Sequence, residues 1–360
     1  MSISRLMQMG AAGAAGGGTF GYLTAPNNDS LTVLDLSDPT NISEVATITD
    51  ATNMSFPVKL KVDLNSGLAY VACGGTDGLA IVDISNPSSM SVVGSIQNTD
   101  IGAAQDVALD TINNVCYVCS ASHDRVTSID VSNPSAPSII YNRSFINKHT
   151  SYWLGIKEAY NNSQLRLYMA DYQTDRIFQF DQLPSNFDIN SQQSDADFDG
   201  ASGMALDFST GQMYVQSAID QRLTTMAFTD TGFTSGTLRT VVTGLSGSET
   251  AGVALDQTNK VVYSPFRDTF FAINVSNPLS MSIISSFSVA GASSLTGGVS
   301  LDLERGIAYL PDAFNDRIFC IDISNPSSMS VIGSYTSTNL NAVRFMAISQ
   351  TPPQGTNAYT

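Results

Sequence analysis

Charge is scarce in this sequence, and so are histidine, tryptophan and long apolar runs. Only 13% of the 360 residues are charged, there are two His and one Trp, and the net charge is −16. This acidity argues against nucleic acid as a partner, because proteins that bind a phosphate backbone present a basic face. The most apolar stretch near the N-terminus, residues 7–18, is too short and too rich in glycine for a bilayer span or a signal peptide. We therefore expect no membrane span and no Sec export.

Cysteine is also rare, and its pattern does not favour redox or metal chemistry. The four residues are Cys73, Cys116, Cys119 and Cys320, and the middle two have CxxC spacing. Their context, NNVCYVCSAS, is typical of a β-strand, in which residues three apart point to opposite faces. A second CxxC, which a zinc cage needs, is missing. We expect all four to be buried free thiols.

What the sequence does contain is a repeat of roughly 50 residues, the size of a four-stranded propeller blade. It is clearest in residues 58–96, VKLKVDLNSGLAYVACGGTDGLAIVDISNPSSMSVVGSI. Short apolar runs alternate there with turns rich in Gly, Ser, Asn and Asp, which favours strands and tight turns. The sequence predicts an all-β fold.

Three positions of the repeat give the number of blades. The first strand ends in a Leu-Asp type pair, at Asp63, Asp110, Glu158, Asp207, Asp256, Asp302 and, degenerately, Ser349. The second strand centres on Tyr22, Tyr70, Tyr117, Tyr168, Tyr214, Tyr263 and Tyr309. One Asp precedes each third strand: Asp29, Asp77, Asp124, Asp175, Asp220, Asp268 and Asp316. Seven third strands predict seven four-stranded blades.

The Asp ring formed by these last seven residues has two interpretations. A ring of carboxylates on one face of the disc is suited to a cation or a basic partner. Aspartate also accepts a hydrogen bond from the backbone two residues further on and so nucleates a turn, which explains one Asp per blade without any ligand. We favour the turn-forming role.

The two chain ends are expected to share the closing blade. Residues near the C-terminus supply its first strand, and residues 21–48 supply the later ones, which removes exposed sheet edges. Tyr22 and Tyr359 compete for the second strand, and the sequence leaves this choice open. The predicted organisation is an arm at residues 1–19 followed by the propeller at residues 20–360.

The units GLAIVDISNPSSMSVVGSI and IFCIDISNPSSMSVIGSY resemble the LVIVD-repeat family of β-propellers, as do IDVSNPSAPSII and INVSNPLSMSII. The resemblance implies a seven-bladed propeller. It implies no particular activity, because propellers include hydrolases, lyases, receptors and scaffolds. The middle blades, around residues 164–193 and 203–242, lack the SNP turn and are assigned by spacing alone.

One acidic segment matches half of a calcium loop. Asp195, Asp197 and Asp199 alternate before Gly200, as in the first half of an EF-hand loop. The closing bidentate Glu is missing, because Leu206 stands at that position. An acidic surface loop is the alternative, and Ca²⁺ is the only cofactor that the sequence suggests.

Catalytic motifs are few, so we expect a protein that is not an enzyme. His123 lies in a polar turn, and neither it nor His149 has a nucleophile at a suitable spacing. Trp153 and Tyr172 lie where aromatic rings at the mouth of a propeller channel are able to stack on sugars. A buried core position is the alternative for Trp153.

The arm suggests the biological context. Residues 1–19, MSISRLMQMGAAGAAGGGT, bury too little surface to order alone, so we expect another subunit to hold them, through Arg5, Leu6, Met7 and Met9. The start of the arm resembles the N-termini of marine bacteriophage virion proteins. The resemblance implies a tail, fibre or capsid-associated protein, located in the virion, whose arm binds other virion proteins within an oligomeric assembly.

Two other classes of function remain open at this point. One is a propeller that binds a carbohydrate or host-surface glycan, located outside the cell by a route other than Sec. The other is a propeller hydrolase or lyase with a metal at the channel, in which case purified protein would contain stoichiometric metal.

Overall fold

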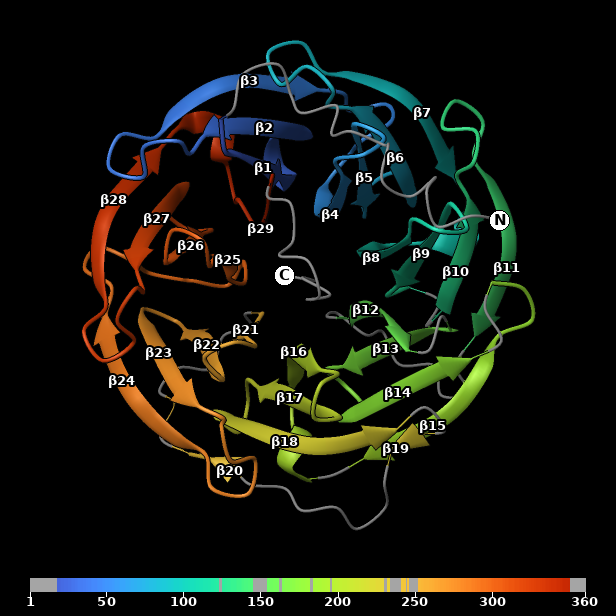
Figure 1. Ribbon diagram of the computed structural model, residues 1–360. Coiled ribbons are helices and arrows are strands. Elements are labelled where there is room, and N and C mark those ends of the chain that lie inside the picture. The colour runs from blue at the N-terminus through green and yellow to red at the C-terminus, as the bar shows by residue number, and fades with distance from the viewer. Residues whose placement is uncertain are drawn as a thin grey trace, which may run out of the picture.

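Four-stranded antiparallel sheets recur seven times around a common axis in the computed structural model of the chain (Figure 1). The structure describes residues 18–122, 125–144, 154–161, 164–181, 184–194, 196–229, 232–233, 241–243, 245 and 252–349. Each sheet is one blade, with one strand beside the axis and the last strand at the periphery. The predicted all-β, seven-bladed propeller is confirmed.

The inner strands of blades 1 to 7 are β29 (Phe345–Ile348), β4 (Pro57–Asp63), β8 (Ala104–Asp110), β12 (Leu154–Asn161), β16 (Ala201–Asp207), β21 (Ala254–Asp256) and β25 (Ser300–Asp302). The second strands are β1 (Phe20–Ala25), β5 (Leu68–Cys73), β9 (Val115–Ser120), β13 (Gln164–Asp171), β17 (Gln212–Ser217), β22 (Val261–Phe266) and β26 (Ile307–Asp312). The third strands are β2 (Ser30–Asp35), β6 (Gly78–Asp83), β10 (Arg125–Asp130), β14 (Arg176–Asp181), β18 (Arg222–Thr229), β23 (Thr269–Asn274) and β27 (Arg317–Asp322). The outer strands are β3 (Ser43–Thr49), β7 (Ser91–Gln97), β11 (Ser138–Ser144), β15 (Asp188–Ser194), β24 (Ser282–Ser288) and β28 (Ser330–Thr336), while in blade 5 the short strands β19 (Gly232–Phe233) and β20 (Val241–Val242) both pair with β18.

The repeated tyrosines form the centre of the packing. All seven predicted residues are at most 4% exposed: Tyr22, Tyr70, Tyr117, Tyr168, Tyr214, Tyr263 and Tyr309.

The pairing of these tyrosines with residues of the inner strands corrects one prediction. Lys61 lies opposite Tyr70 and Lys157 lies opposite Tyr168, so Ala159 rather than Glu158 is the equivalent of Asp63.

The closing blade is composite, as predicted, and the structure settles which end supplies its second strand. β1, which contains Tyr22, pairs with β2 on one side and with the C-terminal strand β29 on the other (Figure 1). Tyr359 lies outside the described residues. The N-terminal segment therefore supplies three of the four strands, and the C-terminal segment supplies one.

Polar contacts reinforce the junction between blades 7 and 1. The Arg305 guanidinium of blade 7 donates to the Leu36 carbonyl oxygen of blade 1 at 2.6 Å. On the outer side, the Glu44 carboxylate of blade 1 accepts hydrogen bonds from Asn339 Nδ2 at 2.7 Å and Ser337 Oγ at 3.2 Å. The composite blade is thus held to blade 7 by polar contacts, in addition to the β1–β29 ladder that joins the two chain ends.

The Asp residues before the third strands join neighbouring blades. Four of these carboxylates accept a backbone N–H from the residue that leads into the inner strand of the next blade, not from their own turn as predicted. The pairs are Asp29 with Phe56 at 2.8 Å, Asp77 with Ala103 at 2.7 Å, Asp175 with Gly200 at 3.0 Å, and Asp316 with Ala342 at 2.8 Å. Both members of every pair have a positive φ, between 49° and 72°.

Two members of the predicted Asp ring differ from these four. In blade 5 the residue with positive φ directly before β18 is Gln221, so Asp220 is one residue out of register. In blade 6 Asp268 directly precedes β23, as predicted, and its carbonyl oxygen accepts the Val289 N–H, but the turn is shorter and its positive φ falls on Arg267. Asp124 lies outside the described residues. The blade count from these residues was right, although the ring is less regular than the spacing predicts.

The turns after the third strands dock against the outer strand of the preceding blade. A Cβ atom on Gly94 of β7 would lie 2.0 Å from the carbonyl oxygen of Pro134, in the SNP turn of the next blade. One on Gly333 of β28 would lie 2.1 Å from that of Pro39, in the equivalent SDP turn of blade 1. Any side chain there would therefore push the two blades apart. The Pro-containing turn of one blade and the Gly of the preceding outer strand therefore pack directly against each other.

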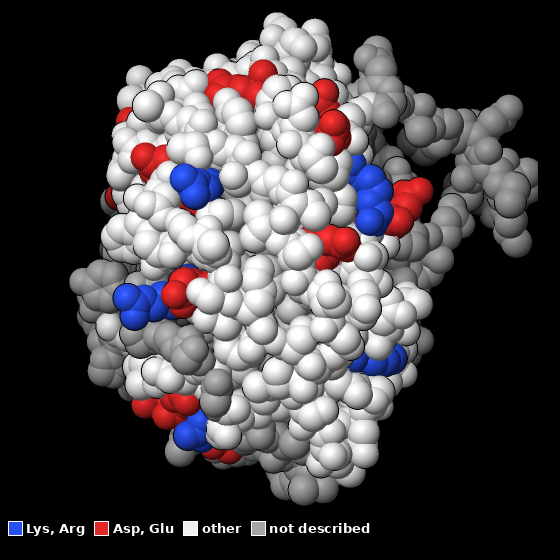
Figure 2. Space-filling view, turned by 90° about the vertical axis from the view of Figure 1, so that its left-hand side faces the viewer, with Lys and Arg blue, Asp and Glu red and all other residues white. Residues whose placement is uncertain are grey.

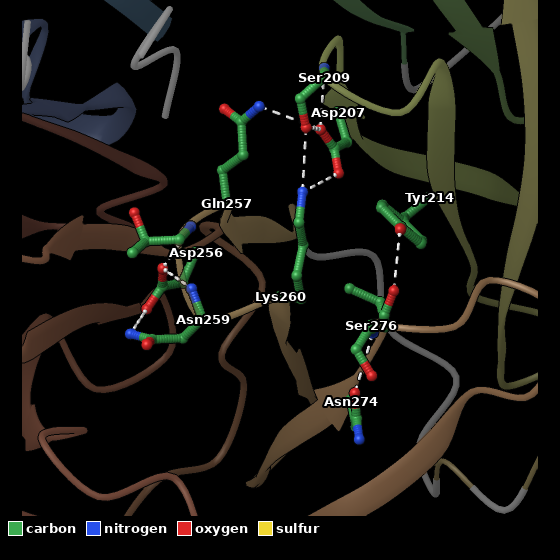
Figure 3. A network of polar contacts seen from close by, with 11 residues as sticks. Asp207, Ser209, Tyr214, Asp256, Gln257, Asn259, Lys260, Asn274 and Ser276 are labelled. Atoms are coloured by element: carbon green, nitrogen blue, oxygen red, sulfur yellow. Dashed lines mark hydrogen bonds and ion pairs between the residues drawn. The ribbon is translucent and has the colours of Figure 1, made fainter. Parts of the chain in front are cut away.

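A buried carboxylate joins blades 5 and 6 (Figure 3). It lies at the end of an inner strand, on the face of the disc opposite to the Asp residues that precede the third strands. Asp207 is fully buried and accepts from Lys260 Nζ at 2.7 Å, Gln257 Nε2 at 3.0 Å and the Ser209 N–H at 3.1 Å. Burial alone would raise the pKa of Asp207, but the bonds from Lys260 and its neighbours outweigh burial and hold that pKa below its usual value.

Some surface charges occur in local pairs. The side of the molecule in Figure 2 shows blue and red atoms in small neighbouring groups on a largely uncharged surface. Arg143 and Asp188 on the outer strands, 2.6 Å apart, are one such pair, and the Asp188 side chain is 61% exposed. Exposed pairs of this kind contribute about 0–1 kcal/mol each.

Substitution of Asp77 by Ala tests the contact between blades. The change leaves the Ala103 N–H without its charged acceptor, so we expect a loss of about 1.5–3 kcal/mol in the free energy of unfolding. Urea unfolding followed by circular dichroism measures it. Asp77→Asn, which keeps an acceptor and tolerates positive φ, should lose less. Asp220→Ala removes an Asp of the predicted ring that lies out of register, and a loss as large as that of Asp77→Ala would contradict the assignment.

Substitution of Lys260 by Met tests the buried pair. Because the Asp207 pKa is depressed in the folded chain, its contribution is complete above the unfolded value of about 3.9 and is lost as the pH falls through the lower folded pKa. We expect Lys260→Met to cost roughly 3 kcal/mol at pH 7, with a smaller difference near pH 3, in urea unfolding at both pH values. Arg143→Met breaks an exposed pair and should cost no more than about 1 kcal/mol. Equal costs for the two variants would contradict the buried role.

Candidate functional site

One level of the inner strands differs sharply between the two halves of the ring. The residues at this level lie two positions before the residue that faces the repeated Tyr. Blades 1, 2 and 3 place Phe345, Lys59 and Asp106 there, whereas the other four blades place Gly155, Gly203, Gly252 and Gly298 there. We call Phe345, Lys59 and Asp106, together with the adjacent Phe56 and Arg344, the rim site.

Lys59 and Asp106 are fixed in the rim site by their strands and by each other. A β-bulge precedes each of them, between Pro57 and Lys59 in β4 and between Ala104 and Asp106 in β8. Bulges re-aim side chains and are common beside functional sites. The Lys59 ammonium lies 2.8 Å from the Asp106 carboxylate, and their side chains are 27% and 11% exposed. This pair joins blades 2 and 3 near the axis.

Arg344 and Phe56 extend the rim site toward blade 1. The Arg344 guanidinium carbon lies 5.7 Å from the centre of the Phe56 ring, within the range of a cation–π contact. Burial lowers the pKa of Arg344. The Phe56 side chain is 36% exposed. It borders the turn at Gly74, which has no side chain to cover the ring; a Cβ atom there would lie 3.4 Å from it.

Sequence reasoning missed Phe56, Lys59, Asp106 and Arg344. An available signal was the position of Phe56 immediately before an inner strand, since Trp153 stands at the same place before β12. The pairing of Lys59 with Asp106, which are 47 residues apart, has no sequence signature.

The glycine half of the level brings backbones together instead of side chains. A Cβ on Gly252 would lie 3.3 Å from the Gly298 Cα atom, so the chain segments that lead into β21 and β25 approach closely. Both strands are short, with three residues each. Side chains that are able to bind a ligand at this level are therefore confined to blades 1 to 3 within the described residues.

The acidic segment proposed for calcium has other contacts in the structure. Asp197, in the one-turn helix η4 (Ala196–Phe198), forms an ion pair with Arg222, and its carbonyl oxygen accepts from Ser217 Oγ at 2.8 Å. Gly200, assigned by the calcium interpretation to the sharp turn, donates its N–H to Asp175. These contacts recur in other blades and explain much of the pattern without a metal.

Blade 3 provides the parallel for that ion pair. Asp100, in the helix η3 (Thr99–Ile101), pairs with Arg125, as Asp197 pairs with Arg222. Asp195 lies outside the described residues, and no cluster of three His, Cys, Asp or Glu suitable for a metal occurs within the described part of the chain. Calcium at Asp195, Asp197 and Asp199 stays a prediction.

Tyr172 lies on the same face as this segment, beside blade 5. A Cβ on Gly200 would lie 3.1 Å from its Cε2 atom. Burial, followed by the charges of Asp199 and Asp175, raises the pKa of Tyr172. Trp153, His123 and His149 lie outside the described residues. Sugar stacking by Trp153 and Tyr172 stays a prediction.

All four cysteines are buried free thiols, as predicted. Cys116 packs in the core between blades 2 and 3 and Cys119 in the core between blades 3 and 4, which confirms that they point to opposite faces of β9. Burial raises the pKa of Cys73 to about 12, so its thiolate is disfavoured.

The arm residues Arg5, Leu6, Met7 and Met9 lie outside the described part of the chain. Thr19 belongs structurally to the propeller, because its carbonyl oxygen accepts the Leu36 N–H at 2.7 Å. The division into an arm at residues 1–19 and a propeller at residues 20–360 stays a prediction. Within the described residues, no helix has the length and apolar character of a membrane span.

Comparisons with known proteins agree on the fold. The LVIVD repeat matches residues 18–50, 61–98, 101–143 and 308–337, which fall in blades 1, 2, 3 and 7. The sequence matches none of the curated proteins with which it was compared.

Solved structures of similar shape come from several bacteria. A Lactobacillus plantarum protein has a TM-score of 0.75 and 12% identity, over 92% of this chain and 99% of its own. A Bacteroides fragilis protein named for a proposed 6-phosphogluconolactonase activity has a TM-score of 0.76 and 9% identity, over 94% and 99%. The periplasmic gluconolactonase of Pseudomonas aeruginosa has a TM-score of 0.71 and 10% identity, over 92% and 98%.

These neighbours correct the expectation that the protein is not an enzyme. A gluconolactonase shares its shape, so the lack of a catalytic motif in the sequence does not exclude hydrolytic chemistry. At these identities the likeness establishes the fold alone. The chain is a seven-bladed β-propeller that carries LVIVD repeats in four neighbouring blades.

Proposed function

We propose that this propeller binds a small anionic sugar, of the sugar-acid or phosphosugar class, at the rim site. The observation that carries the proposal is the difference between blades at one level of the inner strands. Three neighbouring blades have Phe345, Lys59 and Asp106 there, and the other four have glycine. A purely structural ring has no need of this difference between repeated blades. Glycines on the opposite side leave the axis free of competing side chains at this level.

Charge supports an anionic ligand. The chain has a net charge of −16 and only five lysines, yet Lys59 and Lys61 lie two residues apart on β4, and Arg344 lies in the neighbouring blade. Cations gathered near the axis of an acidic protein attract an anion and repel other cations. The Lys59 ammonium has three donors, of which the Asp106 carboxylate takes one, so it remains able to bind an oxyanion.

The other rim residues suit a sugar. The partly exposed ring of Phe56 offers a flat apolar surface for the C–H face of a pyranose. The Asp106 carboxylate is able to accept hydrogen bonds from hydroxyl groups, which is the usual way in which acidic residues orient sugars. Cation, carboxylate and aromatic ring together match an anionic sugar better than an inorganic anion or a neutral glycan.

Titration calorimetry with gluconate, glucuronate, 6-phosphogluconate and neutral glucose tests the proposal. We expect the anions to bind more tightly than glucose, with affinity that falls as salt rises. Lys59→Met should weaken anion binding about tenfold or more, because it removes a charge-assisted hydrogen bond. Arg143→Met makes the same change in net charge on the outer strands and should leave affinity unchanged.

Equal affinity for gluconate and glucose, or equal losses in the two variants, would overturn the assignment of the rim site. The same samples are incubated with gluconolactone. Hydrolysis by the wild type that is lost in Asp106→Asn would extend the proposal from binding to catalysis.

We further propose that the propeller is carried on a larger assembly through its N-terminal arm, as a virion protein that presents the rim site to host-surface glycans. The support is the leader sequence MSISRLMQMGAAGAAGG and its resemblance to marine bacteriophage virion proteins. A glycan that contains sugar acids would join both proposals.

A variant that lacks residues 1–17 tests the role of the arm. The cut preserves the bond from Leu36 N–H to the Thr19 carbonyl oxygen, so we expect unchanged circular dichroism and unfolding. Analytical ultracentrifugation of the variant and the full chain, each mixed with the virion proteins encoded beside it, measures assembly. We expect the variant to stay free. Normal assembly without the arm would refute the anchoring role and leave the rim site untouched.

A further inference from the structure

One position of the second strands, directly after the repeated Tyr, is polar in a single blade. At the position after the repeated Tyr, six blades carry fully buried apolar side chains: Leu23, Val71, Val118, Met169, Val215 and Leu310. Blade 6 carries Ser264, which is equally buried. A serine is smaller than any of these residues, and it places a hydroxyl group at a position that is apolar in the other six blades.

The next position along the strand has an exception in the adjacent blade. Blade 5 carries Gln216, fully buried, where blades 2 and 4 carry Ala72 and Ala170. Gln216 is the largest and most polar of the equivalent residues. The two exceptions, Ser264 and Gln216, therefore lie on neighbouring blades and differ by one position along the second strand.

Both side chains project into the interface between blades 5 and 6. Gln216 Nε2 donates to the Pro265 carbonyl oxygen of blade 6 at 2.9 Å, and Pro265 directly follows Ser264. Ser264 lies two residues after Val262, which packs with Tyr214 of blade 5, so Ser264 is on the face of β22 that covers blade 5. The side chains thus approach each other from opposite blades.

One oxygen atom of each side chain has no hydrogen-bond partner: Gln216 Oε1 and Ser264 Oγ. The orientation of the Gln216 amide is fixed: the Pro265 carbonyl oxygen only accepts hydrogen bonds, so it must face the Nε2 donor rather than Oε1. A buried acceptor left unpaired is costly, and native proteins commonly satisfy such groups with an ordered water molecule that makes two to four hydrogen bonds.

We propose that the interface between blades 5 and 6 contains a built hydration site, in which one water molecule bridges Gln216 Oε1 and Ser264 Oγ. The water donates one hydrogen to the amide oxygen and exchanges a second hydrogen bond with the hydroxyl group. It replaces the methyl groups that fill this layer in the other blades. The site lies behind the glycine half of the ring level, separate from the rim site.

A crystal structure of the full chain at high resolution tests the site directly. We expect a single density peak within roughly 2.7–3.2 Å of both oxygen atoms. An empty site would overturn the proposal, and so would a peak surrounded by five or more oxygens at about 2.4 Å, because that geometry belongs to a cation.

Two variants test the coupling through the water. Ser264→Val supplies the residue type of blades 2, 3 and 5 and should remove the peak, lower the melting temperature and leave Gln216 Oε1 unpaired. In the Gln216→Ala background, which has the residue type of blades 2 and 4, the same substitution should raise the melting temperature. Equal shifts in the two backgrounds would overturn the bridging role. Should Ser264→Val not fold, Ser264→Ala in both backgrounds gives the same comparison.

Discussion

The ring depends on a hydrogen bond between a carboxylate and a backbone N–H at the boundary of one blade and the next. In the pairs of Asp29 with Phe56 and Asp77 with Ala103, both residues adopt positive φ, a conformation that non-glycine residues avoid unless their surroundings enforce it. The bond fixes the direction in which the chain leaves a turn of one blade and, at the same time, the point at which the next inner strand begins. Packing of the tyrosine layer and docking of the SNP turns both require that these two directions are already set.

A scaffold held together in this way tolerates differences at positions that none of these repeated contacts uses. The level of Lys59 and Asp106 is such a position, since the ion pair between these two residues joins blades 2 and 3 only. Four blades have glycine at this level, and three have side chains that differ in charge and shape. Repetition therefore provides the frame, and departure from repetition marks the surface on which selection for binding is able to act. The same logic identifies Gln216 and Ser264, which depart from the repeat inside the core.

The sequence predicted the features that recur and missed those that occur once. Seven tyrosines and seven turns gave the blade count, because each recurrence repeats the same packing requirement. Asp220 and Glu158 were assigned by spacing and lie one residue out of register, since a shift of one residue leaves the spacing of the strands almost unchanged. The acidic segment around Asp197 resembled a metal loop because Asp197 pairs with Arg222, 25 residues further along the chain, which a local pattern does not show. The rim site was missed for a related reason: Lys59, Asp106 and Arg344 meet only when the ring is closed.

The composite blade has a mechanical consequence. A pull applied at residue 18 acts along β1, which is hydrogen bonded on one side to β2 and on the other to β29. Both ladders are then loaded in shear, so their bonds must break together rather than one after another. A propeller tethered by its N-terminal end would therefore load the two ladders of the composite blade first, before the force reached any other blade.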